Sequence, residues 1–174
     1  MSPATIFQIQ LALGYVPWLF LVRTYVWPRL KVMNPVDAHR AIAVLHSFRF
    51  FGLVFLVPGV VGPNPPAEFA TFSAYGDLAT GVLAMLALLT ARMRSLFWPF
   101  VVAFNVVGAA DILIDYYHGI QVGLAALAGE LGATYAIPMI YVPVLMVTHA
   151  LAFYLLARQL GTARGLEPSS VIAP

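Results

Sequence analysis

The chain has 174 residues, of which 61% are hydrophobic and 9% are charged, and its mean hydropathy is +0.89. This composition excludes an ordinary soluble globular protein, in which about a quarter of the residues carry charge. The net charge of +2 gives no reason to expect a nucleic-acid partner, and the lack of cysteine excludes disulfides and thiolate metal sites. The partner that the composition predicts is the lipid bilayer.

Five apolar stretches dominate the sequence. A helix that crosses a membrane needs about 20 apolar residues, and five segments meet this requirement, at residues 5–27, 41–61, 69–91, 96–117 and 134–157. We therefore expect an all-α integral membrane protein in which residues 1–160 form one five-helix transmembrane bundle. Residues 161–174 are polar and are expected to form a disordered tail.

The segments between the predicted spans differ in character. Residues 119–132 are too short and too rich in glycine for a span, so they predict a short interfacial or re-entrant helix packed on the bundle. The second span has a clear start, because Asn34 can cap a helix and Pro35 suits its first position. His39 follows in the first turn and is expected at the surface.

The basic residues predict an orientation. Eight of the nine lysines and arginines border the loops on one side of a five-span bundle, namely Arg23, Arg29, Lys31, Arg40, Arg92, Arg94, Arg158 and Arg164. Basic loops stay in the cytoplasm, so the N-terminus is expected outside and the C-terminus inside. One lysine against eight arginines is typical of a GC-rich bacterial genome, which indicates the bacterial inner membrane.

Six polar side chains interrupt the apolar spans and form the candidate site. Charged groups inside a bilayer are costly, so they face the bundle interior, pair with one another and often serve function. With a rise of about 1.5 Å per residue, four helices place these groups in one slab, which predicts a polar pocket in the cytoplasmic half. The six residues are His46, Arg49, Asp77, Asn105, Asp111 and His149.

Partners within this slab follow from charge and helical phase. Arg49 cannot lose its proton, so it requires a counter-charge, and Asp77 is the carboxylate predicted to pair with it. Asn105 and Asp111 lie about 120° apart around their helix, so both cannot point at one atom. Asn105 is expected to form a hydrogen bond between helices, whereas Asp111 and Asp115 line a polar vestibule on the outer side.

The leading functional prediction is a cofactor or ligand site, with b-type haem first. His46 and His149 lie at matched depth on different helices, as two axial ligands of a haem iron require. Arg49 is one turn from His46 and would bind a propionate. A variant of this reading is a non-haem metal site that combines the two histidines with Asp77 or Asp111.

Three other functions stay open at this stage. Buried Asp, His and Arg groups are also typical of a proton-coupled transporter of small solutes. A structural or accessory subunit would use the polar layer only to fix the register of the helices. An intramembrane enzyme acting on lipid or quinone is the last alternative. A homodimer or a larger membrane complex would suit the transporter and the accessory subunit.

Overall fold

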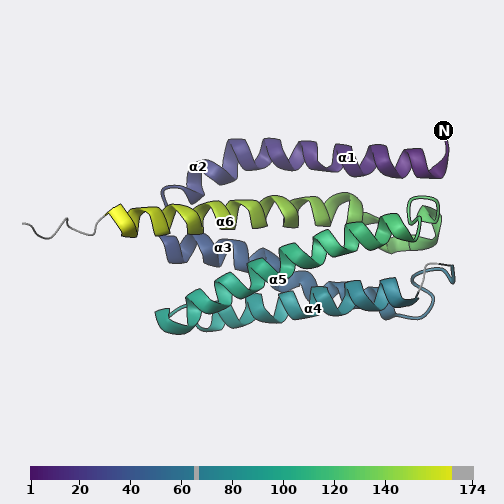
Figure 1. Cartoon of the computed structure of the whole chain (residues 1–174). Coiled ribbons are helices and arrows are strands. Elements are labelled where there is room, and N and C mark those ends of the chain that lie inside the picture. The colour runs from purple at the N-terminus through teal and green to yellow at the C-terminus, as the bar shows by residue number, and fades with distance from the viewer. Residues whose placement is uncertain (65–66, 166–174) are drawn as a thin grey trace, which may run out of the picture.

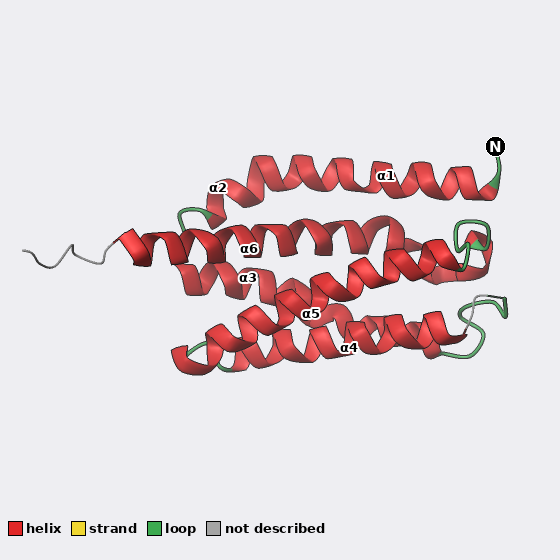
Figure 2. Ribbon diagram, viewed as in Figure 1, coloured by secondary structure: helices red, strands yellow, loops and turns green. Residues whose placement is uncertain are grey.

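The computed structural model describes residues 1–64 and 67–165, and all regular structure in this part of the chain is helical (Figure 2). Five helices are long and apolar enough to cross a membrane. They run side by side along one direction and alternate in sense (Figure 1). The five spans predicted from hydropathy are therefore present as helices.

Several of the five long helices change type along their length. The first long helix consists of α1 (Pro3–Leu21), the π-helical η1 (Val22–Val26) and α2 (Trp27–Leu30), and the second consists of α3 (Pro35–Ser47) and the 3₁₀-helical η2 (Phe48–Leu56). The third is α4 (Ala67–Leu89) and the fourth is α5 (Arg94–Gln121). The fifth begins with the π-helical η4 (Ile137–Tyr141) and continues as α6 (Val142–Gly165). A further 3₁₀ segment, η3 (Ala128–Tyr135), lies between the fourth and fifth.

Helix boundaries follow local chemistry. The Asn34 side chain accepts a hydrogen bond from the Asp37 backbone N–H at 2.9 Å, and Pro35 occupies the first helical position, so the predicted start of α3 is confirmed. The second span ends at Leu56 and not at residue 61. The reason is that Val57 precedes Pro58 and adopts an extended backbone.

Two other predicted boundaries were wrong. The fourth helix continues to Gln121, turns follow it, and the short helix predicted at residues 119–132 is η3, which begins at Ala128. Gly123 (φ 64°) and Gly132 (φ 50°) adopt left-handed conformations there, which favour glycine. The last helix includes residues 161–165 of the predicted tail, and the remainder of that tail lies outside the described residues.

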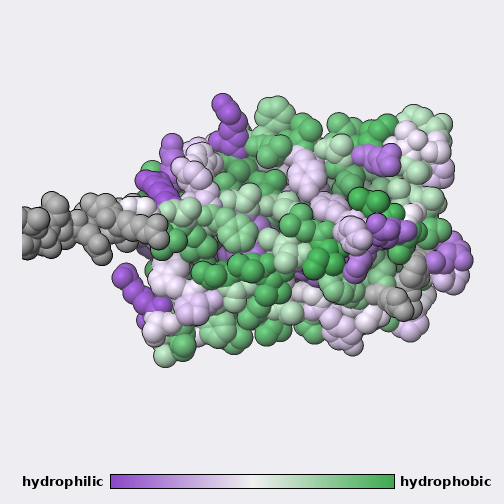
Figure 3. Space-filling view, in the orientation of Figure 1, coloured by the Kyte–Doolittle hydropathy of each residue, from purple (hydrophilic) through white to green (hydrophobic). Residues whose placement is uncertain are grey.

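The bundle has two ends of different character. We call the end that holds the 31–34 and 90–93 connections the basic end, because most of the loop lysines and arginines lie there. The opposite, N-terminal end holds the start of α1 and the turns after α5 (Figure 1). Hydrophobic side chains cover most of the visible face between them, and hydrophilic ones gather toward the two ends (Figure 3).

The apolar interior is divided in the same way. One cluster fills the half next to the basic end and includes Ala43, Ala84, Phe97 and Phe104, all with no exposed surface. A second cluster lies in the N-terminal half and is built around Phe7, Leu124, Leu131 and Met139. The candidate site lies between the two.

Candidate functional site

Arg49 is the centre of the polar layer. Only 1% of its surface is exposed. Its Nε donates a hydrogen bond to Asp77 Oδ1 at 2.6 Å, and its Nη2 donates to Asp111 Oδ2 at 2.5 Å. The pair predicted between Arg49 and Asp77 is present, and Asp111 is a second partner that the sequence reasoning had placed in the outer vestibule.

The remaining guanidinium nitrogen connects Arg49 to two other helices. Nη1 donates to the Gly108 carbonyl at 3.1 Å and lies 3.4 Å from His149 Nε2. Because arginine only donates, His149 Nε2 must be the acceptor, and the ring proton is on Nδ1. That Nδ1–H donates to Asn105 Oδ1 at 2.9 Å. The interhelical hydrogen bond expected of Asn105 is therefore present, and it fixes the tautomer of His149.

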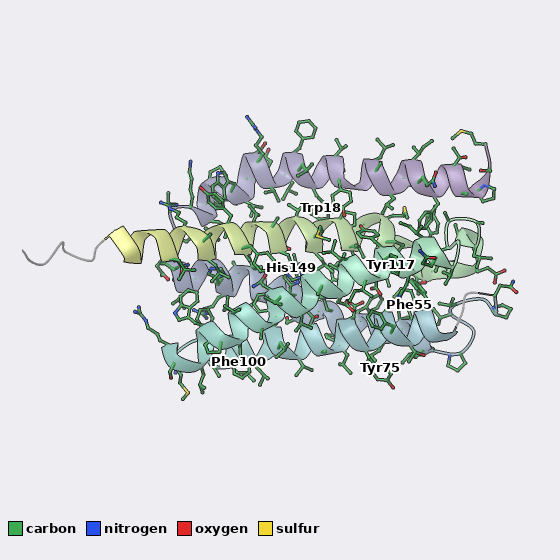
Figure 4. All side chains as sticks on the ribbon, viewed as in Figure 1. Trp18, Phe55, Tyr75, Phe100, Tyr117 and His149 are labelled. Carbon is green, nitrogen blue, oxygen red and sulfur yellow. The ribbon has the colours of Figure 1, made fainter. Side chains whose placement is uncertain are left out.

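Asn105 and Asp111 lie about 120° apart on one helix, and both belong to this site because they bind different partners in it. Asp111 binds Arg49 directly, whereas Asn105 binds His149. We call the set Arg49, Asp77, Asn105, Asp111 and His149 the Arg49 cluster. Figure 4 shows His149 near the middle of the bundle, where α5 and α6 lie close together.

His46 lies against His149 and is held separately. The two ring centroids are 4.0 Å apart, with an angle of 40° between the planes. His46 Nε2 lies 3.0 Å from Thr148 Oγ1, and the Thr148 hydroxyl donates to the Val144 carbonyl at 2.8 Å. His46 Nε2–H is thus the donor to Thr148, and its Nδ1 is buried without a hydrogen-bond partner.

The 3₁₀ geometry of η2 determines what lies beside Arg49. In a 3₁₀ helix, residues three apart share a face, so Arg49, Gly52 and Phe55 point the same way. On an α-helical period, His46, Arg49 and Leu53 would share a face instead. In the structure, Arg49 and Phe55 line a common cavity, and Gly52 lies against Asp77.

Three glycines make room for the charged side chains. A Cβ atom on Gly52 would lie 2.2 Å from Asp77 Oδ2, and one on Gly76 would lie 1.6 Å from Asp111 Oδ1. On Gly108 it would lie 2.6 Å from both Arg49 Nη1 and His149 Nε2. These glycines were not identified from the sequence as part of the site. A signal for two of them is their spacing from aspartates of the Arg49 cluster, since Gly76 directly precedes Asp77 and Gly108 lies three residues before Asp111.

A cavity of about 450 Å³ lies beside the Arg49 cluster. Arg49, Asp77, Ser73 and Asp115 supply polar groups to its wall, and the rest of the lining is mainly apolar, including Phe7, Leu11, Phe55, Phe69, Ile112 and Leu124. Residues from all five long helices, from η3 and from the turns after α5 contribute to it. The cavity therefore lies in the N-terminal half of the bundle.

This position corrects the predicted location of the pocket. The sequence placed it in the half nearer the basic end, at the depth of the buried histidines. That half is filled by large apolar side chains such as Phe97 and Phe104, and neither His46 nor His149 lines the cavity. Asp115 does line it, as the vestibule prediction required, and its Oδ1 accepts a hydrogen bond from Ser73 Oγ at 2.7 Å.

The surface position predicted for His39 is also wrong. His39 has no exposed surface. Its ring packs edge-on against Trp98, with centroids 5.3 Å apart, and both ring nitrogens are buried without a hydrogen-bond partner. It lies in the basic half and takes no part in the Arg49 cluster.

The arrangement of the site has different consequences for the two predicted metal sites, the non-haem metal ion and the haem iron. Within residues 1–64 and 67–165, no group of three or more His, Cys, Asp or Glu side chains is placed to hold a metal ion. The non-haem variant therefore has no ligand set in this part of the chain. For a haem, the two imidazoles are in ring contact, so an iron bound by both would require the rings to separate.

Comparison with curated proteins and with solved structures gave no match. A family model described as "Domain of unknown function (DUF8737)" matches residues 6–157. The matched region holds the whole Arg49 cluster and most of the residues around the cavity. The chain belongs to this DUF8737 family.

Proposed function

We propose that this protein binds a small molecule with an apolar body and a polar group in the cavity beside the Arg49 cluster. The observation that carries the proposal is a cavity of about 450 Å³ with mainly apolar walls and a few charged side chains. Ligand sites in proteins have volumes of about 300–1,000 Å³ and combine apolar walls with a small number of convergent polar groups. The bound molecule would direct its polar group toward Asp77 and Asp115.

The placement of the charges favours binding over a purely structural role. A polar layer that only fixed helix register would need no adjoining space, because its groups satisfy one another. Here Arg49 and Asp77 pair with each other and also form part of the cavity wall. Charged groups at membrane depth that border a cavity are typical of substrate or ligand sites.

We also propose that the bundle crosses the bacterial inner membrane with its basic end in the cytoplasm. Five helices of sufficient length and hydropathy support the insertion, and the distribution of lysine and arginine supports the orientation. In this orientation the cavity lies in the outer half of the membrane.

The binding proposal is tested with adamantan-1-ol, which has a compact apolar body and one hydroxyl. In nanodiscs of phosphatidylcholine, we expect it to raise the thermal midpoint of the protein by about 5 °C at about 100 times its Kd. Leu11→Trp should abolish the shift, because Leu11 lines the cavity. Leu13→Trp is the matched control, since Leu13 is 58% exposed on the same helix. A wild-type midpoint that does not move, or a shift that survives Leu11→Trp, would contradict the proposal.

Haem ligation is a second proposal, supported by the position of His46 and His149 next to each other on two helices, and it requires the two rings to separate so that an iron can lie between them. Its test is the visible spectrum of protein purified from cells supplied with a haem precursor. A Soret band that disappears in both His46→Ala and His149→Ala would support ligation by the two imidazoles. A colourless preparation that also fails to bind added haemin would eliminate it.

A further inference from the structure

We propose that the molecule bound in the cavity is an organic cation, such as a protonated amine with a hydrocarbon body. This inference rests on the proposed binding function and specifies the chemical class of the ligand. Its basis is an excess of carboxyl groups over cations at the polar part of the cavity, together with aromatic side chains in the walls.

The charges of the site do not balance. Three carboxyl groups, Asp77, Asp111 and Asp115, lie around a single guanidinium, that of Arg49. Asp77 and Asp111 both form ion pairs with Arg49. Among the described residues, Asp115 has a hydroxyl partner, Ser73, and no ion-pair partner. The site therefore has one more carboxyl group than Arg49 binds, and that group faces the cavity.

Asp115 is only partly buried, but an uncompensated carboxylate at membrane depth is costly, and it is compensated either by a proton or by a bound cation. A cationic ligand supplies the compensation, whereas a neutral ligand leaves the excess unchanged and an anionic ligand increases it. A charge-assisted hydrogen bond from an ammonium group to Asp115 is also stronger than one from a hydroxyl. Charge thus ranks the three kinds of ligand in the order cation, neutral molecule, anion.

The hydrogen-bond donors of Arg49 also make an anion the least favourable ligand. Four of its five N–H groups already point to an acceptor of the protein, at Asp77, Gly108, His149 and Asp111. An anionic ligand would find at most one N–H of Arg49 that is not already used by the described residues. Asp77, by contrast, keeps 11% of its side chain exposed while it is paired, and it lines the cavity together with Asp115.

The walls indicate that the cation has an organic body. Phe7, Phe55, Phe69 and Tyr116 all line the cavity. Aromatic rings attract cations through their faces and also provide apolar contact area. A hydrated inorganic ion would gain little from such walls, whereas an alkylammonium group with a hydrocarbon body would use both.

The test compares three molecules that share one apolar body and differ in charge: adamantan-1-amine, adamantan-1-ol and adamantane-1-carboxylate. Affinities are taken from titrations of the thermal midpoint in phosphatidylcholine nanodiscs, with the Leu11→Trp variant as the measure of binding outside the cavity. We expect the amine to bind about tenfold more tightly than the alcohol and the carboxylate to bind least.

The variant Asp115→Asn should lower the affinity for the amine about tenfold more than the affinity for the alcohol. Alcohol binding that persists in this variant, and that is lost when Leu11→Trp is added, shows that the cavity is intact. Asp37→Asn is the control, because Asp37 is an exposed carboxylate whose side chain is 44% accessible. Equal binding of amine and alcohol, or an amine preference that survives Asp115→Asn, would overturn the cation inference while the proposed binding function stands. Failure of all three molecules to bind in the cavity would overturn both.

Discussion

The two halves of the bundle are built differently, although both are made of apolar helices. In the basic half, small residues such as Ala43, Ala84 and Ala87 have no exposed surface, and large side chains fill the space between helices. The N-terminal half holds the cavity and three segments that are not α-helical, η2, η3 and η4. The difference indicates that one half holds the bundle together and the other provides the site.

Backbone irregularities border the cavity. The 3₁₀ segment η2 ends two residues before Pro58, and the π-helical η4 contains Pro138. Proline and π-helical turns interrupt regular helix packing. The basic half contains an irregular segment as well, the π-helical η1 (Val22–Val26) followed by Pro28, but there alanine contacts bring the other helices close together. The Arg49 cluster lies at the boundary, where its ion pairs are shielded on one side and accessible from the cavity on the other.

The largest effect concerns the orientation of the two halves. If the basic half lies toward the cytoplasm, fusions at Gly62 and Gly129 should show alkaline phosphatase activity and no fluorescence. Fusions at Ser95 and after Pro174 should show fluorescence and no phosphatase activity. The readout is all or none, measured with a paired alkaline phosphatase and fluorescent protein reporter. Any exchange between the two groups of sites would reverse the assignment of the cavity to the outer half.

The next largest effect tests the boundary between the halves. Arg49→Met should lower the free energy of unfolding by about 3–5 kcal/mol, because it leaves Asp77 and Asp111 buried without a cation. Adding Asp77→Asn and Asp111→Asn should recover part of the loss, since the buried charges are then removed together. The measurement is denaturant unfolding in detergent.

The control for Arg49 is Arg40, whose ion pair with Asp37 is exposed, with 52% of the Arg40 side chain accessible. Arg40→Met should cost at most about 1 kcal/mol. If the triple variant at the Arg49 cluster loses as much as the separate losses added together, the ion pairs are not coupled.

A smaller effect separates glycines that hold space for the cluster from those that do not. Gly108→Ala should destabilise the protein by about 1–3 kcal/mol, because its Cβ would lie 2.6 Å from Arg49 Nη1. Gly161→Ala, in the same unfolding assay, should stabilise it by about 0.5–1 kcal/mol. A Cβ on Gly161 meets no atom within 4 Å. Effects of the same sign at both positions would contradict the role assigned to Gly108.

The smallest effect is expected at His39, in the basic half. Its ring nitrogens have no hydrogen-bond partner, so His39→Leu should raise the free energy of unfolding by about 1 kcal/mol. His46→Leu should lower the free energy of unfolding instead, because the Thr148 hydroxyl loses the hydrogen bond that it accepts from His46. A loss of stability in His39→Leu would indicate that the imidazole has a partner that the packing against Trp98 does not reveal.

The sequence was sufficient for the features that depend on composition and on simple charge balance. Five spans follow from hydropathy, and the partnership of Arg49 with Asp77 follows because a guanidinium in hydrocarbon requires a counter-charge. The capping of α3 by Asn34 is local chemistry and was also predictable. The function and the orientation stay predictions.

The features that the sequence did not reveal depend on several helices at once. The 3₁₀ form of η2 occurs where this segment packs closely on α4 and Gly52 lies against Asp77, and no local pattern in the sequence predicts it. Burial of His39 depends on where Trp98 of another helix lies. The cavity is a space bounded by several helices and the turns after α5, so no single segment predicts which half contains it.

If the bundle crosses the membrane as proposed, the closed packing of the basic half has a consequence for the energy stored across that membrane. Any path from the cavity to the basic end would have to pass the apolar layer that includes Phe97, Val101 and Phe104, none of which has exposed surface. Such a layer insulates, because ions and protons do not cross dry hydrocarbon readily. A molecule that enters and leaves the cavity would do so from a single side, and its exchange would leave the membrane potential undisturbed.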